Sequence, residues 1–216
     1  MRIPFSDIDP DYRIEDAWKE FINPVLRDAD FKGSGRNFRR IAGEFVQCVN
    51  LQGASYGGSF AINIGIQPLA MLGDPDERVT KNSIKEIDCE FRRRATDGPF
   101  DQWWKYTQLV SSKKRAAQNA ASVLKGFGLP VLDRMCSPES PLLTIDPVSF
   151  AAGIFDFQGF GLSKIRVALT LARMRKAAGD LSACRGFAQY GLDQITVIGA
   201  IGLRSQLTEL ANTQAD

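Results

Sequence analysis

Residues 59–68 read SFAINIGIQP and carry the clearest fold signal in the chain. Apolar residues alternate with small or polar ones along this stretch, which is typical of a β-strand with one buried face. The apolar set is Phe60, Ile62, Ile64 and Ile66, and the opposite set is Ala61, Asn63, Gly65 and Gln67. The stretch therefore predicts a strand that buries its isoleucines and presents amides on its other face.

Neighbouring segments repeat this two-sided pattern. Residues 37–43 and 45–52 precede the strand, and residues 85–94, KEIDCEFRRR, follow it. Glycine-containing turns, such as residues 53–58, separate the first segments, so we expect an antiparallel meander. The residues expected to share the apolar face are Phe45, Val49 and Leu51 in the second segment and Ile87, Cys89 and Phe91 in the last.

The remaining segments have helical spacing. Residues 12–27 predict an amphipathic helix whose Trp18, Phe21 and Val25 cover the isoleucines of residues 59–68. Beyond Ser111 the strand patterns give way to helical ones. We therefore expect an α+β protein with an antiparallel meander sheet packed on an N-terminal helix, followed by a mainly helical C-terminal half. The expected regions are 1–110 and 111–216, and the sequence leaves open whether they form one packed unit.

The composition limits the chemistry. Hydrophobic residues make up 44% and charged residues 24% of the 216 residues, which suits a folded enzyme or a folded binding protein. The chain contains no histidine, so a histidine-dependent catalytic triad and a histidine-based metal site are excluded. Carboxylate or lysine chemistry stays open, and no motif indicates a cofactor. Four widely spaced cysteines predict buried, reduced thiols: Cys48, Cys89, Cys136 and Cys184.

Charge and hydropathy limit the partners. No run of about eighteen apolar residues occurs, so we expect a cytoplasmic protein without a membrane span. Residues 1–110 hold 15 Lys and Arg against 17 Asp and Glu, and the remaining residues hold 12 against 8. Neither part is strongly polarised, so nucleic-acid binding is not expected.

Polar side chains gather on the face opposite the isoleucines. Amides beside arginines can bind a carboxylate, a phosphate or a peptide backbone. The candidate binding residues on this face are Asn50, Gln52, Asn63, Arg92 and Arg94. The alternative is an ordinary solvated face, on which Arg92 and Arg94 pair with Asp88 and Glu90 or with residues of other strands.

Two adjacent tryptophans, Trp103 and Trp104, complete the candidate set. Exposed together, they would form a stacking surface for a ligand. The alternative is that one tryptophan is buried in the core and the other lies at its rim.

Four short motifs occur in a defined order: FKGSGRNF from Phe31, VNLQGASYGGSFAINIG from Val49, CEFRRR from Cys89 and QWW from Gln102. Together they resemble the bacterial domain of unknown function 4304 over about residues 11–107. The resemblance implies an α+β domain with a meander sheet, and no established catalytic residue, cofactor or substrate. Glu90 stands where relatives are expected to have a polar residue, often histidine.

Two function classes follow from these patterns. The favoured one is a non-enzymatic module that binds a protein partner through the polar face, for example an immunity protein against a toxin. The alternative is a sensor or enzyme for a small anionic ligand held by Arg92 and Arg94 and oriented by Asn50, Gln52 and Asn63.

Overall fold

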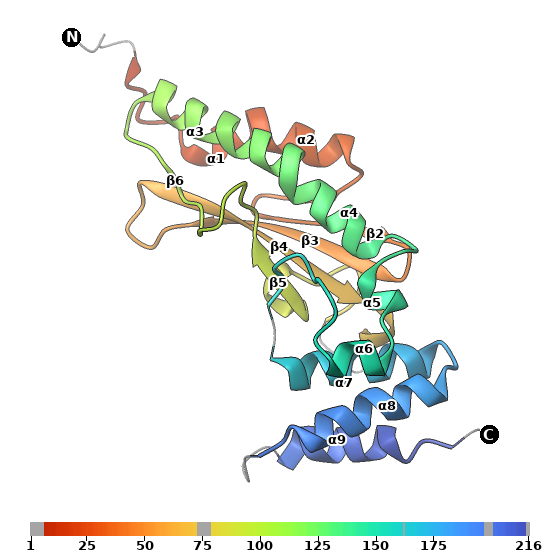
Figure 1. Ribbon diagram of the computed structural model, residues 1–216. Coiled ribbons are helices and arrows are strands. Elements are labelled where there is room, and N and C mark those ends of the chain that lie inside the picture. The colour runs from red at the N-terminus through yellow and green to blue at the C-terminus, as the bar shows by residue number, and fades with distance from the viewer. Residues whose placement is uncertain (1–6, 73–78, 162, 197–200, 215–216) are drawn as a thin grey trace.

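The computed structural model describes residues 7–72, 79–161, 163–196 and 201–214. Its centre is a six-stranded antiparallel sheet with the order β1-β2-β3-β4-β5, in which β6 also pairs with β4 (Figure 1). This arrangement confirms the predicted meander. The strands are β1 (Lys32–Ser34), β2 (Asn37–Ala42), β3 (Phe45–Gly53), β4 (Ser59–Pro68), β5 (Phe91–Arg94) and β6 (Trp104–Lys105).

The strand register confirms the predicted faces of β3 and β4. Asn63 of β4 lies opposite Asn50 of β3 on one side and Arg94 of β5 on the other. Side chains of directly opposed residues project from the same face, so these amides share a face with Arg94. All four residues of the apolar set of β4 are buried: Phe60, Ile62, Ile64 and Ile66.

Two helical segments cover this apolar face (Figure 1). The N-terminal one consists of α1 (Ile14–Ala17), a π-helical turn (Trp18–Ile22) and α2 (Asn23–Asp28). As predicted, its Trp18 packs on Phe60, with the ring centroids 5.2 Å apart. The second segment consists of α3 (Val110–Val123), a π-helical turn (Leu124–Gly128) and α4 (Leu129–Cys136).

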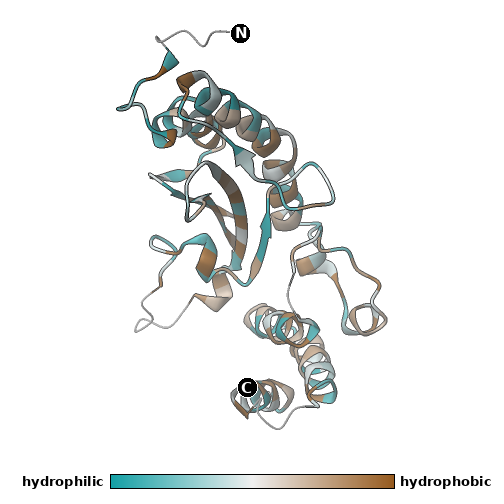
Figure 2. Cartoon of the chain, turned by 90° about the vertical axis from the view of Figure 1, so that its left-hand side faces the viewer, coloured by the Kyte–Doolittle hydropathy of each residue, from teal (hydrophilic) through white to brown (hydrophobic). Residues whose placement is uncertain are grey.

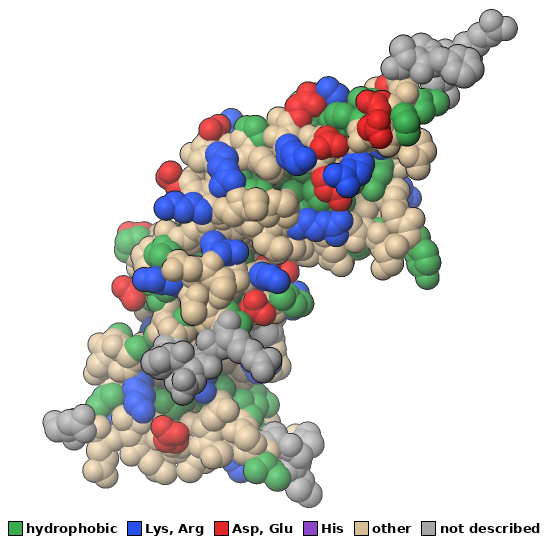
Figure 3. All heavy atoms as spheres, turned by 180° about the vertical axis from the view of Figure 1, so that it is seen from behind, with side chains coloured by type: hydrophobic (Ala, Val, Ile, Leu, Met, Phe, Trp, Pro, Cys, Tyr) green, Lys and Arg blue, Asp and Glu red, His purple; other side chains and the backbone are tan. Residues whose placement is uncertain are grey.

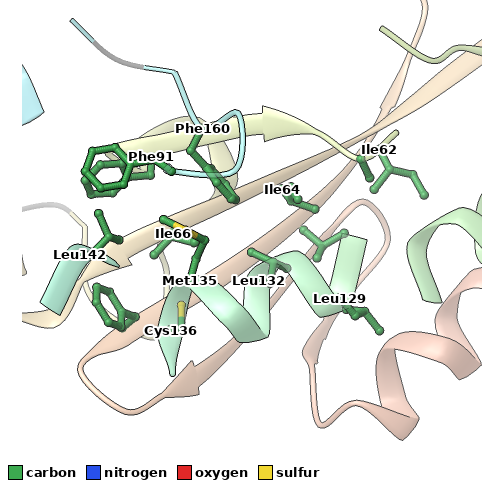
Figure 4. Packing of buried hydrophobic residues seen from close by; sticks show 14 of the residues in the cluster. Ile62, Ile64, Ile66, Phe91, Leu129, Leu132, Met135, Cys136, Leu142 and Phe160 are labelled. Atoms are coloured by element: carbon green, nitrogen blue, oxygen red, sulfur yellow. The ribbon is translucent and has the colours of Figure 1, made fainter. Parts of the chain in front are cut away.

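Helix α4 completes the core. Figure 4 shows its Leu132 and Met135 beside the isoleucines of β4. Gln47 is a polar residue buried on this face, and its amide donates to the Leu132 carbonyl at 3.0 Å. The apolar face therefore needs residues from beyond position 110 to close it, in addition to the predicted N-terminal helix.

The N-terminal helix begins at Ile14 rather than at Tyr12, and its turn just before Pro24 is π-helical. Proline has no backbone N–H, so it cannot donate the bond that would continue an α-helix. The N–H of Asn23 donates to the Trp18 carbonyl, five residues back, which is the π-helical pattern. The helix accommodates Pro24 in this way without breaking.

The strand predicted over residues 85–94 is wrong in its first half. Residues Glu86–Asp88 form a 3₁₀ turn, and β5 begins only at Phe91. The Asp88 carboxylate accepts a hydrogen bond from the Lys85 N–H at 2.9 Å, a local contact that competes with strand pairing. As a consequence Ile87 is 63% exposed instead of buried.

This turn also places Cys89 on the unexpected face. Cys89 packs with Val46, Cys48 and Ile84 in a small cluster on the polar side of the sheet. Gly65 lies beneath it, and a Cβ atom at that position would come within 2.9 Å of the Cys89 side chain. The segment around Ile84 and Cys89 therefore covers one end of the polar face.

The C-terminal helices form a group at the end of β4 (Figures 1 and 2). They are α5 (Pro141–Thr144), α6 (Pro147–Ala151), α7 (Lys164–Ala177), α8 (Leu181–Asp193) and α9 (Ile201–Ala211). The chain turns between α7 and α8 at Gly179, which has φ of +78°, and the Asp180 carboxylate caps α8. Residues 197–200, part of the region predicted to be mainly helical, lie outside the described residues.

Buried contacts tie this group to the rest. Phe157, between α6 and α7, packs on Phe91 of β5 with the ring centroids 6.2 Å apart. Within the group, the Arg175 guanidinium of α7 donates to the carbonyls of Leu142 and Ile145. Among the described helices, none combines the length and the hydropathy that crossing a bilayer requires.

Candidate functional site

A ladder of three asparagines crosses the open end of the polar face. Asn37, Asn50 and Asn63 lie opposite one another on β2, β3 and β4. The Asn50 amide donates to Asn37 Oδ1 at 2.8 Å, and the Asn63 amide donates to Asn50 Oδ1 at 3.4 Å and to Gln52 Oε1 at 2.9 Å. These side chains hold each other in fixed positions, and each amide group keeps capacity for a further hydrogen bond.

Arg94 extends the ladder onto β5. It lies opposite Asn63, and its Nε is 2.9 Å from a carboxylate oxygen of the exposed Asp101. Its guanidinium carbon lies 4.4 Å from the centre of the Trp103 ring, a cation–π distance. Trp103 remains 36% exposed. We call the combined surface the amide face, and it consists of Asn37, Asn50, Gln52, Asn63, Arg94 and Trp103.

Arg92 belongs to the covered end of the sheet rather than to the amide face. Its Nε lies 2.7 Å from Glu86 Oε1, and the Glu86 side chain is only 5% exposed. The two carboxylates named as expected partners were wrong, because Glu90 pairs with Arg166 of α7 and Asp88 caps the 3₁₀ turn. Glu86 was not expected at this position, since the turn that brings it over β4 was predicted as strand.

The two tryptophans lie on opposite sides of the sheet. Trp104 is buried and stacks on Phe60, with the ring centroids 5.5 Å apart. Trp103 lies on the other face with Arg94. The pair therefore follows the predicted alternative of one buried and one rim tryptophan, and the two rings do not form a joint stacking surface.

One member of the amide face and one residue that pairs with it were not predicted from the sequence. Asn37 and the Arg94 partner Asp101 were both passed over. Asn37 could have been found, because alternation along residues 37–43 assigns it to the same side as Arg39. Asp101 carried no signal, since it lies in a loop whose path depends on the tertiary structure.

The thiols near the sheet are poor nucleophiles. The hydrogen bond to Cys48, together with burial, raises the pKa of the Cys89 thiol far above its ordinary value. Burial likewise raises the pKa of Cys136 to about 12. A nucleophilic cysteine must be ionised near neutral pH, so neither thiol has the property that covalent catalysis requires.

Comparisons with known proteins place the chain in a family. No curated protein and no solved structure matches it. A family model, that of the domain of unknown function DUF4304, matches residues 22–134, from the N-terminal helix through the sheet to α4. The match ends beyond the resemblance noted in the sequence, because it includes the helices that close the apolar face. The chain belongs to the DUF4304 family.

Proposed function

We propose that this protein is a non-enzymatic module that binds a protein partner through the amide face. The observation that carries the proposal is the fixed Asn37–Asn50–Asn63 ladder beside the exposed Trp103. Amides can bond a partner's backbone, and an exposed tryptophan on an arginine is a typical centre of a protein interface. An immunity protein that neutralises a toxin in the bacterial cytoplasm is one form of such a module.

The shape of the surface favours a protein over a small molecule. Small-molecule sites are concave, whereas protein interfaces are broad and nearly flat. Four pockets in the described part of the chain, of about 590, 370, 370 and 320 Å³, are lined by residues outside the amide face. The ladder lies across a sheet, which is a broad surface of this kind.

The charge distribution gives less support to small-anion binding and to nucleic-acid binding. Arg92 and Arg94 were expected to bind a small anion, but each guanidinium already forms an ion pair with a carboxylate. Acidic and basic side chains are mixed over the side of the molecule seen in Figure 3, whereas a nucleic-acid site concentrates positive charge.

Site-specific photo-crosslinking in the native host tests the proposal. A crosslinking residue at exposed Gln52 should capture one discrete protein, whereas the same residue at exposed Val148 on α6 should not. Equal capture from both positions, or none from Gln52, would contradict the proposal.

Purified partner then allows a matched comparison. Trp103→Ala should weaken binding by about 2 kcal/mol or more, as expected for an interface centre. Phe127→Ala is the control, because Phe127 is also exposed but lies in the helical layer over the opposite face. Asn63→Ala should weaken binding as well and lower the free energy of unfolding by no more than about 1 kcal/mol. Equal affinities of the two aromatic variants would remove Trp103 from the interface.

A further inference from the structure

A second polar site lies at the outer edge of the same sheet face. It is a pocket of about 590 Å³ between β1, β2 and the segment that contains Lys81 and Asn82. Its basic lining residues are Lys32, Arg39, Arg40 and Lys81, and its acidic one is Asp30. This volume lies within the range of small-molecule sites.

Three of the four cations keep their charge available. Arg40 pairs with Asp133 and lies 4.7 Å from the centre of the Phe31 ring, so it is engaged in the fold. Lys32, Arg39 and Lys81 form no ion pair with a carboxylate in the described ranges of the chain. The pocket therefore has an excess of positive charge.

The strand register makes this excess unfavourable without a ligand. Lys32 of β1 lies directly opposite Arg39 of β2. Like charges in directly opposed positions of an antiparallel pair destabilise a sheet. An anion between the two side chains would turn this repulsion into attraction.

Arg39 has an unsatisfied donor close to this anion position. Its Nη1 donates to the carbonyl of Asn82, which holds the guanidinium beside the pocket. Its Nε is buried and has no hydrogen-bond partner among the residues that the structure describes, and leaving a buried donor unpaired costs free energy. A tilt of the side chain toward the pocket would present Nε and Nη2 together, the edge of the guanidinium that binds two oxygens of a phosphate or a carboxylate.

An apolar wall stands beside these donors. Ile41 lines the same pocket and is 54% exposed. It lies two residues after Arg39 on β2, so both side chains project from the same face. An inorganic ion would leave this wall uncovered.

We propose that this pocket binds a small organic phosphate, which Lys32, Arg39 and Lys81 hold by its charge and Ile41 contacts through its apolar part. The site is separate from the amide face and does not depend on a protein partner. Lys32 and Lys81 act as point charges, whereas Arg39 orients the phosphate through two parallel hydrogen bonds.

Titration calorimetry with phenyl phosphate and orthophosphate at about 0.15 M ionic strength tests the site. The wild-type protein should bind phenyl phosphate more tightly than orthophosphate. Lys32→Gln with Lys81→Gln should weaken phenyl phosphate binding about tenfold or more, as expected for lost charge-assisted contacts. Lys105→Gln is the control, because Lys105 is an exposed cation on β6, opposite Ser59 of β4, and does not line the pocket.

Two single variants sharpen the result. Asp30→Asn should tighten binding about two- to fivefold, since it removes the pocket's carboxylate. Asparagine tolerates the φ of +63° found at Asp30, so the fold should be kept. Ile41→Thr should abolish the preference for phenyl phosphate over orthophosphate, because it removes most of the apolar wall.

The proposal is overturned if the wild-type protein gives no saturable heat with phenyl phosphate at millimolar concentrations. It is also overturned if the double lysine variant binds as tightly as Lys105→Gln. An unchanged preference in Ile41→Thr would overturn the assignment of an organic phosphate. These substitutions replace exposed or partly exposed side chains, so urea unfolding should show intact folds.

Discussion

Polar side chains form different kinds of hydrogen bonds on the two faces of the sheet. On the helix-covered face, buried Gln47 uses its amide for the Leu132 carbonyl and accepts from Arg40 Nε at 2.7 Å. On the other face, Asn50 and Asn63 bond mainly to neighbouring amides and stay partly exposed. A sealed polar group must be satisfied within the fold, whereas an open one can remain available to a partner. The open face is therefore where binding is expected.

The largest effect should separate two isoleucines that were predicted to share the apolar face. Ile66 is fully buried opposite Phe91, whereas Ile87 is exposed on the 3₁₀ turn. Ile66→Ala should lower the free energy of unfolding by about 2–5 kcal/mol because it leaves a cavity. Ile87→Ala should change it by no more than about 0.5 kcal/mol. Urea midpoints measure both, and equal losses would contradict the placement of the turn.

An intermediate effect is expected at the covered end of the polar face. Arg92→Ala should cost about 1–3 kcal/mol, because it leaves the buried Glu86 carboxylate without its partner. The figure stays below that of a fully buried pair, since the Arg92 side chain is 39% exposed and water can reach it.

Removing the unpaired Glu86 carboxylate should restore most of the free energy of unfolding that Arg92→Ala loses. Adding Glu86→Leu to Arg92→Ala replaces the carboxylate with an apolar group of similar size and should recover stability. A double variant less stable than Arg92→Ala alone would show that Glu86 is held by contacts other than Arg92. Lys19→Ala, which breaks an exposed pair with Asp16, is the control and should be nearly neutral.

The smallest expected effect is on the pH dependence of unfolding, through the ionisation of Tyr12 just before α1. Burial, with a hydrogen bond to Glu20 at 3.0 Å, raises the pKa of Tyr12 to about 12. The folded state therefore favours the neutral phenol, so the stabilisation is complete below pH about 10 and is lost as pH rises from about 10 to about 12. Tyr12→Phe should remove this part of the pH dependence of unfolding.

Ultraviolet titration of the tyrosinates provides the direct measurement. The component near pH 12 should disappear in Tyr12→Phe and persist in Tyr56→Phe, since Tyr56 lies fully exposed in the turn between β3 and β4. Persistence of that component in Tyr12→Phe would show that another tyrosine carries it.

The sequence predicted what depends on local periodicity. Alternation along residues 59–68 assigned Asn63 and the isoleucines to opposite faces, and helical spacing assigned Trp18 to the layer above them. Both assignments are confirmed by the strand register and by the Trp18–Phe60 contact. Period-2 and period-3.6 patterns depend only on backbone geometry, so the residues themselves carry them.

Only the tertiary structure decided which polar groups meet. Glu86 reaches Arg92 through an irregular turn, and Lys81 approaches Arg39 from a segment more than forty positions away along the chain. Helix α4 covers a face that one helix was expected to cover alone. Such contacts depend on how loops cross a packed core, and no periodic pattern records a loop's path. The sequence therefore determined the two faces of the sheet, and tertiary packing determined which part of the polar face stayed open.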